Sequence, residues 1–139
     1  MPRHKFPALC AGFVLLSGCT FLDVRESSWD ASGDKAFADV IGHCFALQRN
    51  GQVMRDDGYA WLAVEDVNGK EPFDSTAPSF LAKGTQFRVT QVMRTHYPQV
   101  GTFGKPYATI DGLAVNVSRV FAQQYGDHAF EPVAAERCD

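Results

Sequence analysis

The sequence predicts a small, mainly β domain, either a barrel or a sandwich, with one or two short helical turns. Two observations carry this prediction. The chain has 139 residues, of which 45% are hydrophobic, so it can bury the core of one domain. Short apolar or alternating segments also recur between Gly, Asn and Asp turns, which is typical of barrels and sandwiches.

The predicted strands are the segments in which apolar and polar residues alternate, or in which an apolar run lies between turns. They are residues 43–49, 52–56, 59–64, 83–94, 106–110, 113–117 and 128–133. Asn50-Gly51, Asp57-Gly58 and Asp111-Gly112 are expected to form tight hairpin turns. Short helical turns are expected at residues 34–42 and 118–121.

Two long loops are expected, at residues 65–80 and 95–105. Loops of this length are uncommon and are often functional. Aromatic residues flank both loops, and rigid rings provide contact area at a low entropic cost. The alternative is that these rings fill the core. The predicted binding surface comprises Phe73, Phe80, Tyr97, Phe103 and Tyr107.

The first residues have the layout of a secretory leader. Arg3 and Lys5 precede an apolar segment, residues 6–16, and small residues follow it. This segment is shorter than the roughly 20 residues that a transmembrane helix needs. The expected organisation is a leader at residues 1–18, a flexible tether at 19–34 and a single β domain at 35–139.

The run Leu16-Ser17-Gly18-Cys19 resembles the lipobox of bacterial lipoproteins. The resemblance implies that the Cys19 thiol receives diacylglycerol, that the leader is removed, and that acyl chains anchor the protein in a membrane. Thr20 stands where an Asp would favour inner-membrane retention, which favours the periplasmic face of the outer membrane. The alternative is an ordinary secreted protein.

The formal net charge of −3 argues against nucleic acid as a partner. Loss of Arg3 and Lys5 with the leader would change the charge to −5. An acidic domain gains nothing from an anionic membrane surface, so the lipid has to provide the anchoring.

Cys44 and Cys138 are the two cysteines of the expected mature domain. An even number of cysteines in an oxidising compartment predicts a disulfide between them. The alternative is two separate thiols.

Few residues suggest catalysis. His43 precedes Cys44, but neighbouring strand residues point to opposite faces, so His43 is badly placed to activate that thiol. No cysteine or histidine spacing indicates a metal site, and no nucleotide-binding motif is present. We therefore expect no enzyme, no metal and no cofactor.

Two segments resemble bacterial SH3-like domains. "KGTQFRVTQV" is similar to the second strand of that family, and "YATIDGLAVNVSRVF" is similar to its later hairpin and helical turn. The resemblance implies an SH3-like barrel over residues 42–133. Leu113 and Val115 replace an aromatic residue that often follows the hairpin Gly, which puts the family's ligand groove in doubt.

The expected function is that of an outer-membrane lipoprotein that acts as a non-enzymatic binding module. Its partner would be an envelope protein or peptidoglycan, contacted through the two expected loops. The alternative is an inhibitor or immunity lipoprotein, whose acidic charge would suit a basic wall-degrading enzyme. A cell-wall hydrolase is the third hypothesis.

Overall fold

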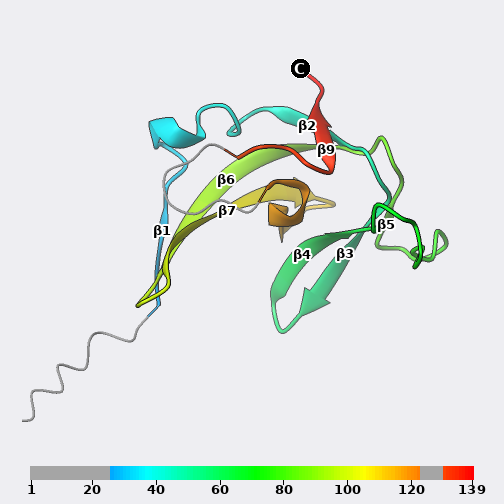
Figure 1. Ribbon diagram of the computed structural model, residues 1–139, viewed down its shortest axis with the longest axis horizontal. Helices are drawn as coiled ribbons and strands as arrows, with labels where there is room; N and C mark the ends of the chain where they lie inside the picture. Colours follow the sequence, from blue (N-terminus) through cyan, green and yellow to red (C-terminus); the bar gives the residue numbers. More distant parts are fainter. Residues whose placement is uncertain (1–25, 123–129) are drawn as a thin grey trace, which may run out of the picture.

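The computed structural model describes residues 26–122 and 130–139, which form a small, mainly β fold (Figure 1). Its elements are β1 Ser27–Asp30, η1 Lys35–Phe37, β2 Cys44–Leu47, β3 Gly51–Asp56, β4 Tyr59–Val64, β5 Phe80–Leu81, β6 Gln86–Tyr97, β7 Gly101–Ile110, β8 Leu113–Asn116, η2 Ser118–Val120 and β9 Ala135–Arg137. The sheet order is β5-β3-β4-β8-β7-β6-β2-β9, and β1 also pairs with β6. Only β4 and β8 are parallel among these strands, so the sheet is open and mixed. The predicted fold class is confirmed at this level.

β6 and β7 form the longest hairpin of the fold (Figure 1). The expected loop at 95–105 is wrong, because β6 continues to Tyr97 and β7 begins at Gly101. The connecting turn is tight: the Val100 N–H donates to Tyr97 O at 3.1 Å, and Gln99 has a φ of 67°. Of the residues 95–105, only 98–100 lie outside the two strands.

The expected hairpin through Asn50 and Gly51 is also wrong. β2 pairs with β6 and β9, whereas β3 pairs with β4 and β5. Asn50 instead joins distant segments, since Nδ2 donates to Glu65 Oε2 at 3.1 Å and Oδ1 accepts from the Lys83 N–H at 2.9 Å. Gly51 is closely packed, because a Cβ there would lie 3.0 Å from Leu62 Cδ1 and would have to displace that side chain.

The other two predicted turns are confirmed. Asp57 and Gly58 have φ angles of 43° and 79°, and they connect β3 to β4. Asp111 and Gly112 have φ angles of 51° and 76°, and they connect β7 to β8. Two successive positive φ angles match the right-handed twist of the flanking strands, which explains why Asp-Gly occurs at both hairpins.

Strand pairing begins at Ser27, inside the segment that was predicted to be a flexible tether. Residues 19–25 lie outside the described residues, but β1 pairs with β6 along its whole length. The Ala31 N–H donates to Val92 O at 2.9 Å, and Ala31 is buried. The predicted tether therefore extends no further than the start of β1 at Ser27, and the domain does not start at Lys35.

The last strand lies later than the predicted segment at 128–133. Residues 128–129 are outside the described part of the chain, and Pro132 makes only an isolated β-bridge. The final strand is β9, which pairs with β2 (Figure 1). Directly after β9, the predicted disulfide is present between Cys44 and Cys138, with 5.2 Å between their Cα atoms.

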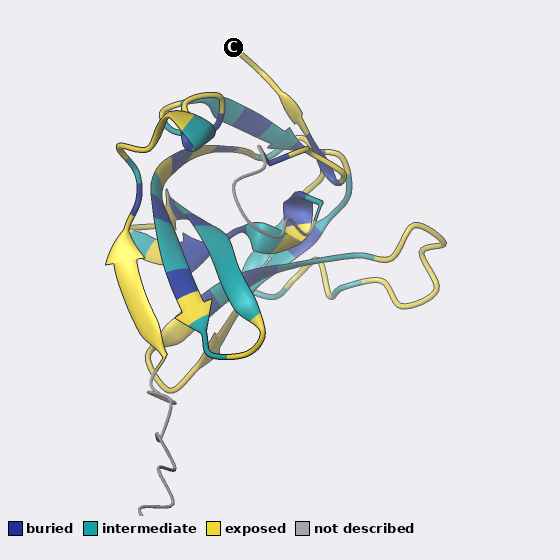
Figure 2. Cartoon of the chain, turned by 60° about the vertical axis from the view of Figure 1, so that its left-hand side comes forward, coloured by how far each residue is buried: buried dark blue, intermediate teal, exposed yellow. Residues whose placement is uncertain are grey.

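One apolar cluster fills the inside of the curved sheet (Figure 2). The short helices contribute to it, since Phe37 of η1 and Val120 of η2 are fully buried. The rings of Phe37 and Phe130 stack with centroids 5.3 Å apart, and Phe45 meets Phe121 edge-on at 5.1 Å. These ring contacts attach the C-terminal segment to the core.

Candidate functional site: an aromatic groove

β7 carries three large side chains on one face. Phe103, Lys105 and Tyr107 are partly exposed, whereas Pro106 and Ala108, on either side of Tyr107, are buried. This alternation follows from the pleat, which turns successive side chains to opposite faces of a sheet. Phe103, which was expected in a loop, therefore lies on the same strand as Tyr107, which was expected in a strand.

Tyr97, at the end of β6, contacts two residues of β7. Its ring centroid lies 5.7 Å from that of Phe103, with an angle of 64° between the ring planes. Lys105 Nζ donates to Tyr97 Oη at 2.7 Å and lies 5.3 Å from the centre of the Tyr97 ring. An ammonium close to an aromatic ring is attracted by the ring quadrupole. The structure thus brings Tyr97 and Phe103 together with a lysine.

The environment of Lys105 keeps its ammonium charged at neutral pH. Burial acts to lower the pKa of Lys105, but the hydrogen bond to Tyr97 and the nearby phenols outweigh it, so the pKa is raised. Among residues 26–122 and 130–139, no carboxylate lies within ion-pair distance of Nζ. The charge of Lys105 is therefore not neutralised by an acidic group of the described domain.

A cross-strand row continues from β7 to β4. Tyr107 pairs with Asn116 of β8, and Asn116 pairs with Trp61 of β4. Asn116 Nδ2 donates to Tyr59 Oη at 2.6 Å, and the Tyr59 ring stacks on Trp61 with centroids 5.6 Å apart. Burial raises the pKa of Tyr107, so its phenol stays neutral. The row therefore presents aromatic and amide groups without acidic charge.

The start of η2 borders the same row. Asn116 is only 5% exposed, and its Oδ1 accepts from the Ser118 N–H at 2.8 Å. Arg119 follows with an exposed side chain, for which the described residues provide no ion-pair partner. One buried asparagine thus fixes both the position of Tyr59 and the beginning of η2.

Two hollows meet at η2. Their volumes are about 710 Å³ and 530 Å³, and Asn116, Ser118 and Arg119 line both of them. We call their combined surface the aromatic groove. Its main residues are Tyr97, Phe103 and Lys105 at one end, Asn116, Ser118 and Arg119 in the middle, and Tyr59, Trp61, Asp56 and Asp57 at the other end. Tyr107 lies on β7, next to the groove, but lines neither hollow.

Phe73 and Phe80 are not part of this groove. The Phe73 N–H donates to Glu65 Oε1 at 2.9 Å, at the base of the loop between β4 and β5. Phe80 belongs to β5 and pairs with Gln52 of β3. The five predicted surface residues therefore do not form one continuous surface. A role in binding for Phe73 and Phe80 stays a prediction.

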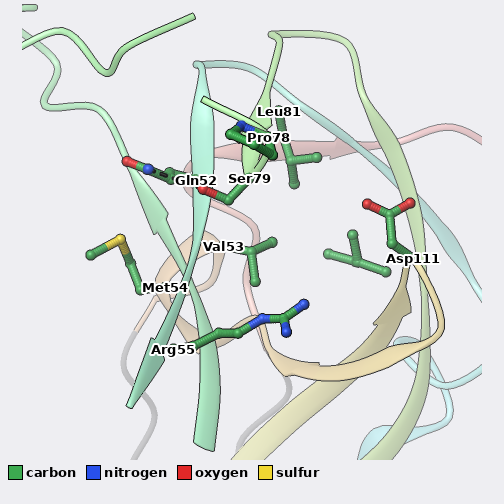
Figure 3. Close-up of a pocket in the computed structure, with 9 residues that line it drawn as sticks. Gln52, Val53, Met54, Arg55, Pro78, Ser79, Leu81 and Asp111 are labelled. Carbon is green, nitrogen blue, oxygen red and sulfur yellow. Dashed lines mark hydrogen bonds between the residues drawn. The ribbon is translucent and has the colours of Figure 1, made fainter. Parts of the chain in front are cut away.

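A third hollow, of about 480 Å³, lies between β3 and the β7–β8 turn (Figure 3). Val53 contributes to its apolar lining, and Gln52 Nε2 donates to Ser79 Oγ at 3.0 Å on one side. Arg55 and Asp111 are its charged residues. No aromatic side chain of the described residues lines this hollow, which distinguishes it from the aromatic groove.

A polar cluster surrounds the disulfide. The Asp139 carboxylate accepts from the Cys44 N–H at 3.1 Å and from Arg137 Nε at 3.1 Å, and it lies 3.3 Å from His43 Nδ1. The Cys44 hydrogen bond is the main cause that lowers the pKa of Asp139 to about 2. Because Cys44 is bonded to Cys138, it offers no thiol to a hydrolase mechanism in the oxidised protein.

Of the ten main residues of the groove, the predicted binding surface included only Tyr97 and Phe103, and it missed Lys105, Asn116 and Arg119 among the others. Lys105 had a local signal, because it lies two residues from Phe103 and two from Tyr107 along β7 and therefore shares their face. Asn116 and Arg119 had none. They join the groove only because β8 meets β4 in parallel and η2 then packs beside β4.

No family model, no curated protein and no solved structure matches the chain. In the part of the chain that the structure describes, no group of three or more His, Cys, Asp or Glu residues is arranged to hold a metal ion. No described helix combines the length and apolar character needed to cross a membrane. The geometry of the groove is therefore the basis for the functional proposal.

Proposed function

We propose that this protein is a lipid-anchored binding module of the bacterial cell envelope and that its ligand occupies the aromatic groove. The observation that carries the proposal is the continuity of the two hollows across Asn116, Ser118 and Arg119. Ligand sites are typically concave and mostly apolar, with a few polar groups that orient the ligand. The aromatic rings and the few polar groups of the groove meet this description.

The proposed architecture is an SH3-like barrel. Its support is the strand pairing: β2 pairs with both β6 and β9, while β6, β7 and β8 follow one another as an antiparallel meander. The short helix η2 lies between β8 and β9 in the chain, and the β3–β4 hairpin is inserted between β2 and β6. The family resemblance of the later hairpin fits this order.

The proposed anchor is a lipid on Cys19, which lies outside the described residues. Support comes from the lipobox residues and from the disulfide, which suits an oxidising compartment. Thr20 supports the periplasmic face of the outer membrane. Labelling of cells with radioactive palmitate should mark the wild-type protein and not Cys19→Ser. A Cys19→Ser protein that still floats with outer membranes would contradict the proposal.

Peptidoglycan is the proposed ligand, because it offers sugar faces and peptide groups together in one polymer. Sugar and peptide groups both pack well against aromatic rings such as those of Tyr59, Trp61 and Tyr97. The sites on a wall polymer are also within reach of a protein that is tethered to the outer membrane. An envelope protein that binds the same groove is the alternative ligand.

The test is co-sedimentation of the purified protein with isolated sacculi. Tyr59→Ala should weaken binding by about tenfold, since central aromatic contacts dominate such interfaces. Trp29→Ala is the matched control, because Trp29 on β1 is 42% exposed and Tyr59 is 43% exposed. Equal binding by both variants, with unchanged melting temperatures, would remove the groove from the proposal.

A second candidate function, an inhibitor of a wall-degrading enzyme, has its own supporting observation. The loop between β4 and β5 projects from the body of the domain (Figure 2). Its base is held by Glu65, whose carboxylate accepts from Asn50 and from the Phe73 N–H, while Val67 is 79% exposed. A projecting loop with a fixed base suits insertion into an enzyme cleft.

The inhibitor function predicts loss of lytic activity in the presence of the protein. Val67→Asp should abolish that inhibition while leaving binding to sacculi unchanged. If the protein inhibits no lytic enzyme of its own envelope, this second function is excluded.

A further inference from the structure

The aromatic groove contains two cationic side chains for which the described residues provide no ion-pair partner. The known ion pairs of the described residues use Arg88, Arg94 and Arg137, together with His43. Lys105 and Arg119 are in none of them, although both line the same hollow. The chain as a whole has a net charge of −3, whereas this hollow is lined by two cationic residues and by no Asp or Glu of the described residues.

Lys105 has hydrogen-bonding capacity to spare. An ammonium has three N–H donors. One of them is used by Tyr97 Oη at 2.7 Å, and no other acceptor for Nζ is found among the described residues. The hydrogen bond to the Tyr97 hydroxyl orients the ammonium. The side chain is also partly buried, which reduces screening by water and salt.

Arg119 adds a second type of donor from η2. Its guanidinium is planar and can hold a carboxylate through two parallel hydrogen bonds. Ser118, its neighbour, already uses its Oγ and N–H on Asn116 Oδ1. Arg119 is therefore the group of η2 that is left to bind an anion in the groove.

The acidic residues of the groove lie at the opposite end. Asp56 and Asp57 line the second hollow together with Tyr59 and Trp61 and do not line the one that contains Lys105. Asp56 and Asp57 repel an anion from that end of the groove. The charge distribution therefore favours a ligand whose anionic group lies at the Lys105 end.

We infer that Lys105 and Arg119 form a carboxylate-binding site in the aromatic groove, and that the ligand is a carboxylate-bearing glycopeptide. The free carboxylate lies between the ammonium and the guanidinium, and the rings of Tyr97 and Phe103 contact the adjoining apolar part of the ligand. This inference rests on the proposed function, and it adds the chemical group by which the ligand is recognised.

The test uses the full-length protein in detergent and two preparations of sacculi, one native and one whose carboxylates are converted to amides with carbodiimide and methylamine. Amidation should weaken binding by about tenfold or more, as expected for the loss of a charge-assisted hydrogen bond. Lys105→Gln and Arg119→Gln should weaken binding to native sacculi by a similar factor and should be insensitive to amidation. Lys105→Arg should retain most of the binding.

Lys83→Gln is the matched control, because Lys83 is exposed and lies outside the groove. Equal binding of native and amidated sacculi by the wild-type protein would overturn the carboxylate site while leaving the proposed function in place. Failure of the wild-type protein to bind either preparation would contradict peptidoglycan as the ligand in the proposed function, and the carboxylate site with it. Reduced binding by Lys83→Gln to the same extent would reveal a nonspecific charge effect and also overturn the site.

Discussion

Asn116 Nδ2 donates a hydrogen bond to Tyr59 Oη at 2.6 Å, and the same side chain accepts from the Ser118 N–H at 2.8 Å. This one amide joins three elements: β8, which carries Asn116, β4, which carries Tyr59, and η2, which begins at Ser118. Because Asn116 is only 5% exposed, water cannot easily replace either partner. The groove therefore has a fixed centre, and its aromatic walls are positioned by a polar residue.

Replacement of this asparagine tests that role. Asn116→Leu should lower the free energy of unfolding by about 1–3 kcal/mol, because it leaves the Ser118 N–H and the Tyr59 hydroxyl without their buried partner. Tyr59→Phe should cost less, about 1 kcal/mol, since it removes one hydrogen bond and keeps the ring. Urea denaturation measures both values. A cost for Tyr59→Phe that equals or exceeds that of Asn116→Leu would contradict the central role of the amide.

The disulfide between Cys44 and Cys138 closes a loop with a sequence separation of 94 residues. Loop-closure entropy predicts that Cys44→Ser combined with Cys138→Ser lowers the stability by about 4–5 kcal/mol. Thermal and urea unfolding with and without reductant check this value. The reduced wild-type protein is the control, and it should match the double variant. A difference below about 1 kcal/mol would show that the β2–β9 pairing alone holds the C-terminal segment.

The low pKa of Asp139, about 2, predicts a pH-dependent contribution to stability. A carboxyl group with a lowered pKa in the folded state stabilises the protein fully above its unfolded value of 3.8, and it loses this contribution as the pH falls towards 2. The stability difference between the wild type and Asp139→Asn should therefore be constant above about pH 5 and shrink below pH 4. Urea unfolding at several pH values measures it. A difference that grows on acidification would refute this assignment.

Gly104 is required by the packing of the aromatic core beneath the groove. A Cβ at this position would lie 2.9 Å from Phe130 Cζ and 3.4 Å from Phe37 Cζ. Gly104→Ala should therefore destabilise the protein by about 1–3 kcal/mol, as overpacking does in a dense core. Gly33→Ala is the control, because a Cβ at Gly33 meets no atom within 4 Å. Thermal unfolding should give a lower melting temperature for Gly104→Ala than for Gly33→Ala. Equal melting temperatures would contradict the packing argument.

Local sequence signals were sufficient where structure depends on neighbouring residues. The two Asp-Gly turns formed as predicted because their positive φ angles are a property of the turn itself. The alternation of Phe87 and Val89 with polar residues placed the first half of β6 correctly. The predicted strand also spanned the bulge between Val89 and Gln91, but it ended at Arg94, so the last three residues of β6 were assigned to a loop.

Signals failed where a distant partner decides the outcome. Asn50-Gly51 has the composition of a hairpin turn, yet Asn50 bonds to Glu65 and Lys83, and Gly51 makes room for Leu62. The aromatic groove shows the same limit. Tyr97 and Phe103 were selected as surface residues, but nothing local indicated that Asn116 and Arg119 would lie in the same groove.

The sequence by itself determined the mainly β character of the domain, its Asp-Gly hairpins and the pairing of Cys44 with Cys138. Alternation, turn chemistry and an even cysteine count are all readable from residues near one another or from simple counting. Only the tertiary structure decided which strands meet and which side chains share the groove. Those relationships depend on sheet order and on the parallel contact between β4 and β8, and such long-range pairings leave no periodic trace in the chain.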